Sequence, residues 1–96
     1  MNLDKAIVHF VDHVNREEMD LELALDMTAF ELFTGLNVAQ AWGYNPADTD
    51  GHYLVMERPI ALLKGNKSLG SFGVRDGSVI HFKRQSVPNE RGAYGA

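Results

Sequence analysis

One change in hydrophobic period most constrains what this chain can fold into. Residues 5–12 are rich in β-branched and aromatic side chains, and residues 19–26 alternate apolar and polar side chains with a period of two; both patterns are typical of strands. Between Thr28 and Trp42 the period becomes three to four, which is typical of a helix, and Thr28 with Glu31 matches a capping box. Strand-like patterns then return in three stretches: 52–57, 60–65 and 79–84. The sequence therefore predicts a single long helix among strands.

Every predicted strand has an apolar face, and the one long helix has to cover these faces together. Residues 5–12 and 19–26 are expected to form one hairpin, and the strands after the helix a second one. The helix can cover both hairpins only if the first and last strands lie parallel in the centre of the sheet. The pattern therefore predicts an α+β domain, with the helix packed across a mixed sheet of four to five strands. The helix residues expected to face the core are Phe30, Phe33, Leu36 or Asn37, Val38 and Trp42.

The length and charge of the chain exclude several classes of function. Its 96 residues are enough for one domain with a single core. The nine Lys and Arg residues form no stripe and the net charge is −4, so the chain lacks the basic footprint of a nucleic-acid-binding protein. No apolar run approaches the roughly 20 residues that cross a bilayer, and the start lacks the pattern of a secretory signal. These features predict a cytoplasmic protein without membrane insertion.

No group of residues has the spacing of a catalytic or metal-binding site. The chain has no cysteine, and no pair of its four histidines shows ligand spacing. We find no nucleophile with a neighbouring base, and no phosphate-cradling loop. The acids between Glu17 and Asp26 are explained more simply as a charged strand face that opposes edge-to-edge association. We therefore expect a protein that is not an enzyme and uses no metal or other cofactor.

The most distinctive stretch of the sequence is KGNKSLGSFGVRDGSVIHFKR, from Lys64 to Arg84. It resembles the turn, the short helical plug and the last strand of ubiquitin, with Leu69 and Phe72 in the plug and His81 on the strand. The stretch from His52 to Phe82 also resembles the small bacterial ubiquitin-like proteins of the YukD/EsaB family. The resemblance covers residues 4–84 and implies the ubiquitin-like β-grasp fold.

The chain continues for twelve residues past the expected last strand, so it divides into a domain at 1–84 and a tail at 85–96. Conjugated ubiquitin-like proteins have such a tail, which ends in Gly-Gly and is activated by an E1-like enzyme. This chain has Arg91-Gly92 and Gly95-Ala96 instead. The resemblance implies a bacterial ubiquitin-like modifier whose tail, trimmed or not by a peptidase, is joined to target proteins by E1- and E2-like enzymes. A frayed end explains the same residues without a function.

Two further classes of function are consistent with this fold. A YukD/EsaB-like adaptor would act in type VII secretion through surface contacts alone, whereas a sulfur carrier would need a C-terminal Gly-Gly. For either a modifier or an adaptor, the resemblance to ubiquitin implies a partner-binding face at Val55, His81 and Lys83. The third strand offers two sets of apolar neighbours, depending on register: Tyr53 with Val55, or Leu54 with Met56.

Overall fold

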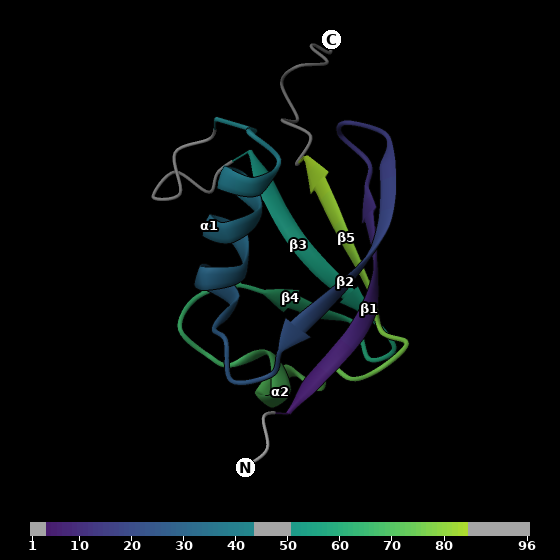
Figure 1. Cartoon of the computed structure of the whole chain (residues 1–96), viewed down its shortest axis with the longest axis vertical. Coiled ribbons are helices and arrows are strands. Elements are labelled where there is room, and N and C mark those ends of the chain that lie inside the picture. Colours follow the sequence, from purple (N-terminus) through teal and green to yellow (C-terminus); the bar gives the residue numbers. More distant parts are fainter. Residues whose placement is uncertain (1–3, 44–50, 85–96) are drawn as a thin grey trace, which may run out of the picture.

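The computed structural model describes residues 4–43 and 51–84, which form one mixed sheet with the long helix packed across it (Figure 1). The elements are β1 (Lys5–Asp12), β2 (Glu17–Ala24), α1 (Ala29–Ala39), β3 (His52–Glu57), β4 (Ala61–Leu63), α2 (Leu69–Phe72) and β5 (Val79–Arg84). The strands lie in the order β2-β1-β5-β3-β4. This arrangement confirms the predicted α+β architecture, with five strands in the described part of the chain.

The first and last strands run parallel in the centre of the sheet, as predicted. His9 lies opposite Val79, and Asp12 lies opposite Phe82. β1 also pairs antiparallel with β2, and β5 pairs antiparallel with β3, so that one hairpin lies on each side of the central pair. The parallel pairing brings together side chains that are about 70 residues apart in the sequence, which matters for the surface described below.

The core lies between α1 and the inner face of the sheet. The apolar side chains that β1, β3 and β5 contribute to it are at most 2% exposed: Ala6, Val8, Phe10, Leu54, Met56, Ile80 and Phe82. Trp42, which follows α1, stacks on Phe82 with ring centroids 4.0 Å apart. Leu54 and Met56 are therefore core residues, which decides the register left open by the sequence and puts Tyr53 and Val55 on the outer face.

The capping box predicted at the start of α1 is present. Thr28 Oγ1 accepts a hydrogen bond from the Glu31 amide at 3.0 Å, and Glu31 Oε1 accepts one from the Thr28 amide at 2.9 Å. Together these bonds satisfy two backbone donors that the first turn leaves without partners. Neither helix of the described residues is long and apolar enough to cross a membrane.

The predicted core face of α1 was partly wrong. Phe33 and Leu36 are buried as expected, but Phe30 is 46% exposed and Val38 is 76% exposed. The buried stripe is Ala29, Leu32, Phe33 and Leu36. It begins at Ala29 and follows the i, i+3, i+4, i+7 pattern, and Phe30 lies about 100° around the helix from Ala29. Because alanine is small, Ala29 was not recognised as the first residue of the buried stripe.

The short α2 fills the lower end of the core, as the sequence predicted. Leu69 has no exposed surface, and the Ser68 side chain caps the turn by accepting from the Ser71 amide. The turn ends at Gly73, where φ is 98°, a conformation that residues with a Cβ rarely adopt. Val74, the next residue, is also buried, and the chain then continues to β5.

Candidate partner-binding surface

The outer face of the sheet, opposite α1, carries a row of side chains that crosses all five strands. Strand register aligns one residue of each strand, and we call this set the central row: Leu62, Val55, His81, Val11 and Glu18. Leu62 is 51% exposed, and Val55, His81 and Val11 are half-buried. The row is apolar on the β4 and β3 side and acidic on the β2 side.

The three residues predicted to form a partner-binding face lie on this outer face. Val55 and His81 are directly opposite each other on β3 and β5. Lys83 lies two positions after His81, on the same side of β5, and its cross-strand neighbour is Tyr53. Strand alternation and register therefore bring Val55, His81 and Lys83 together.

His81 belongs to a hydrogen-bonded chain of three side chains. Its Nε2 contacts Oε2 of Glu57 on β3, and its Nδ1 lies 2.7 Å from Nε2 of His13. A carboxylate can only accept, so His81 Nε2–H donates to Glu57, and one of the two facing nitrogens, His81 Nδ1 or His13 Nε2, donates to the other. The bond to His81 is the main cause that lowers the pKa of Glu57 from its ordinary value.

The chain of hydrogen bonds determines what His81 can offer to a partner. Both of its nitrogens are engaged, and its ring stacks on the ring of His13 with centroids 4.9 Å apart. The side chain retains 17% of its surface exposed. His81 therefore presents part of a fixed ring, without a free nitrogen, to a molecule that lies on the sheet.

The turn between β1 and β2 positions His13. The buried carboxylate of Asp12 accepts from the amides of Val14 at 3.0 Å and Asn15 at 2.8 Å, and these bonds shape the turn. The amide of His13 donates to the carbonyl of Phe82 at 2.9 Å. This bond fixes the end of β1 against β5, so the side chain of His13 lies beside that of His81.

A second ionisable cluster lies on the β2 side of the same face. His9 Nε2 is 2.9 Å from Glu18 Oε1, and His9 Nδ1 is 3.1 Å from Asp20 Oδ1. These contacts raise the pKa of His9, the bond to Asp20 contributing most and the bond to Glu18 next. Glu22 extends the acidic edge opposite the exposed Ile7.

Sequence reasoning missed His13 and Glu57 as members of the surface. His13 is 68 residues from His81, and Glu57 is 24 residues from it. The predicted parallel pairing of the first and last strands was a signal that His13 and His81 could meet. Without the register, however, nothing in the sequence pairs these two histidines.

The predicted conjugation tail, with Arg91, Gly92, Gly95 and Ala96, lies outside the described residues. Within residues 4–43 and 51–84, no group of three or more His, Asp or Glu side chains is arranged to hold a metal ion. The described part of the outer face carries apolar, imidazole and carboxylate groups.

Comparison with known proteins identifies the fold. The chain matches no protein-family model and no curated protein in sequence. Among solved structures it is similar to the ubiquitin-like domain of yeast Ddi1, with a TM-score of 0.67 and 16% identity over 91% of this chain and 96% of that one. It is also similar to the ubiquitin of Caldiarchaeum subterraneum, with a TM-score of 0.65 and 23% identity over 86% of this chain and 96% of that one.

A third similar structure is the C-terminal ubiquitin-like domain of mouse tubulin-specific chaperone e. Its TM-score is 0.71, at 12% identity, over 91% of this chain and 93% of that domain. All three alignments span nearly the whole of the compared domains, so the likeness concerns the complete fold rather than a shared hairpin. This chain has the ubiquitin-like β-grasp fold.

Proposed function

We propose that this chain acts by binding other proteins through the outer face of its sheet, and that it catalyses no reaction itself. The observation that carries the proposal is the central row. Its apolar half, Leu62 and Val55, retains accessible surface. This surface lies next to the ring of His81, which is hydrogen-bonded to Glu57. Burial of such surface against a partner is favourable by about 25 cal/mol per Å².

The charge on either side of the row adds specificity to this proposal. Lys83 lies beside the apolar half, whereas Glu18, Asp20 and Glu22 line the β2 edge. Charges at the rim of an interface steer association and set orientation more than they add affinity. A partner that matches the row would therefore present an apolar centre with basic groups toward β2.

The test of docking is the substitution Val55→Glu, which puts a charge at the centre of the apolar half. We expect proteins that co-purify with the wild-type chain to be depleted at least about tenfold, as for loss of a central interface anchor. Val38→Glu is the matched control, because Val38 is 76% exposed on α1, on the other side of the sheet. Equal loss with both variants, or with neither, would contradict docking on the central row.

The tail supports a second, finer proposal, that the chain is a conjugated modifier. The described fold ends with β5 at Arg84, and residues 85–92 could extend roughly 26–29 Å. Gly92 and Gly95 offer carboxyl groups without a neighbouring Cβ, once the residues after them are removed. An E1-like enzyme would join that carboxylate to the AMP part of ATP, with release of pyrophosphate, and would then bind the acyl group as a thioester, with release of AMP. An E2-like enzyme would take over the acyl group as its own thioester and transfer it to an amine on a target protein, which forms an amide and frees the thiol.

A denaturing blot of the N-terminally tagged chain from its native host separates the modifier from the adaptor. Denaturation removes every non-covalent partner. A modifier gives heavier bands that disappear when residues 92–96 are deleted, and mass spectrometry then shows whether Gly92 or Gly95 is joined. A single band at the size of the free chain under every condition contradicts conjugation. It would favour a YukD/EsaB-like adaptor that acts in secretion through the central row alone.

A further inference from the structure

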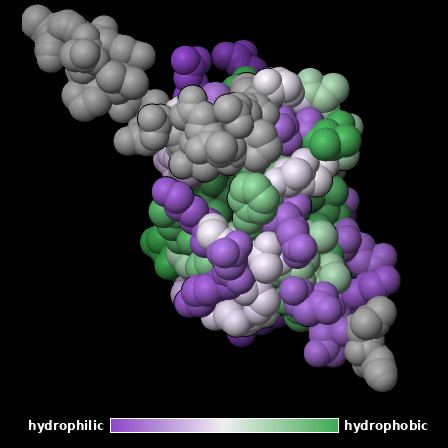
Figure 2. Space-filling model, turned by 90° about the vertical axis from the view of Figure 1, so that its left-hand side faces the viewer, coloured by the Kyte–Doolittle hydropathy of each residue, from purple (hydrophilic) through white to green (hydrophobic). Residues whose placement is uncertain are grey.

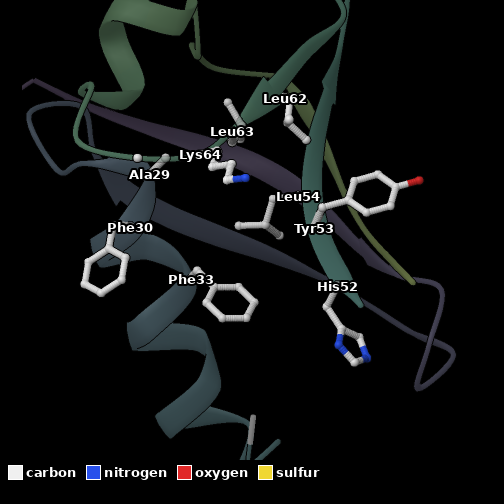
Figure 3. Close-up of a pocket in the computed structure, with 10 residues that line it drawn as sticks. Ala29, Phe30, Phe33, His52, Tyr53, Leu54, Leu62, Leu63 and Lys64 are labelled. Atoms are coloured by element: carbon white, nitrogen blue, oxygen red, sulfur yellow. The ribbon is translucent and has the colours of Figure 1, made fainter. Parts of the chain in front are cut away.

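A groove between α1 and the edge of the sheet is not explained by the surface described above. It encloses about 370 Å³. Figure 3 shows side chains from α1 on one side and from β3 and β4 on the other. The residues that decide its character are Phe30, Phe33, Leu54, Leu62, Leu63 and Lys64. Its walls are thus largely apolar.

Two of the large apolar side chains on these walls remain accessible to solvent. Phe30 is 46% exposed on α1, and Leu62 is 51% exposed on β4. Neither belongs to the buried core, so core packing does not account for them. Figure 2 shows the side of the molecule that carries α1, where green apolar residues are exposed among purple hydrophilic ones. The accessible ring of Phe30, in a groove that Phe33, Leu54 and Leu63 also line, is suited to holding an apolar group.

Lys64 gives the groove a positive charge. Figure 3 shows its side chain next to Leu63 and Leu54, within the groove. Among residues 4–43 and 51–84, Lys64 takes part in no ion pair, and none of the groove's lining residues is acidic. An occupant with a negative charge next to its apolar group would complement Lys64 without meeting a carboxylate.

The position of the groove favours a peptide over a small molecule. The volume lies near the lower end of ligand pockets, which hold about 300–1,000 Å³, so it suits one or two side chains. One wall is formed by β4, the edge strand of the sheet. An edge strand is a place where an extended segment of another protein can lie alongside.

We propose that this groove binds an acidic peptide segment of a partner protein, with an apolar side chain against Phe30 and a carboxylate against Lys64 Nζ. The groove adjoins the central row at Leu62, but Phe30, Phe33 and Lys64 belong to the groove and not to the row. The chain therefore has two docking surfaces, one on the outer face of the sheet and one between the sheet and α1. The second does not depend on conjugation of the tail.

The test begins with a heptapeptide phage library selected on the immobilised full chain. The most enriched peptide is then synthesised, and its affinity is measured by fluorescence anisotropy. We expect an apolar residue next to Asp or Glu, and a Kd raised at least about tenfold by Phe30→Ala and by Lys64→Glu. Two-dimensional NMR should place the largest shifts at residues that line the groove.

Matched variants keep this test independent of folding and of net charge. Val38→Ala shortens another exposed apolar side chain of α1, and Lys67→Glu makes the same charge change outside the groove; both should change the Kd less than about twofold. Enriched peptides without acids, NMR shifts confined to Val55 and His81, or no enriched peptide would each overturn the proposal.

Discussion

His9 is the residue whose ionisation the structure defines most clearly. Its imidazole lies between Asp20 and Glu18, and both contacts raise its pKa. A raised pKa in the folded state means that protonated His9 stabilises the fold. That stabilisation is complete below the unfolded value of about 6.5 and is lost as the pH rises through the folded pKa.

Asp20→Asn should lower the pKa of His9, because Asp20 makes the largest contribution to its shift. The variant should lose stability relative to the wild type near pH 6 and approach the wild type in alkaline solution. NMR titration of the His9 ring and urea unfolding at both pH values measure these effects. Glu22→Gln is the control, since Glu22 lies on the same face of β2 but opposite Ile7. An unchanged His9 titration in Asp20→Asn would contradict the contact.

At the scale of elements, the strands were predicted more accurately than the helix face. The bounds of β1, β3 and β5 match the predicted stretches, because runs rich in β-branched and aromatic residues mark these strands. β2 spans Glu17–Ala24 instead of 19–26, since its ends are set by pairing with β1 and by the turn that Asp12 holds. The sequence of β2 alone does not indicate where its pairing with β1 begins and ends.

The candidate site was predictable to the extent that it depends on strand alternation. Val55, His81 and Lys83 share a face for that reason, and their grouping was foreseen. The bonds of His81 to His13 and Glu57 depend on register and on side-chain conformation, which local sequence does not encode. The groove was missed because Phe30 was assigned to the core.

At the scale of elements, the capping box of α1 can be tested by substitution. Thr28→Ala removes the acceptor for the Glu31 amide and should lower the free energy of unfolding by about 1 kcal/mol. Thr28→Ser keeps a hydroxyl in place and should lose clearly less. Urea unfolding of both variants at neutral pH gives the comparison. Equal stability of Thr28→Ala and the wild type would show that this cap does not hold the start of α1.

At the scale of the whole molecule, one sheet serves two purposes. Its inner face and α1 bury the core, while its outer face keeps an apolar centre next to an acidic edge. The central parallel pair makes this possible, since it joins the two hairpins and brings His13 to His81. The fold therefore supplies a rigid platform, and the proposed function depends on what that platform contacts.

The measurement that tests this account most directly is photo-crosslinking in the native host. A benzophenone amino acid replaces Lys83, at the edge of the central row, or Val38, on the exposed side of α1. The account predicts discrete crosslinked products from position 83 that disappear when Val55→Glu is added, and no such Val55-dependent products from position 38. Absence of products at position 83, or products that persist with Val55→Glu, would contradict docking on the outer face of the sheet.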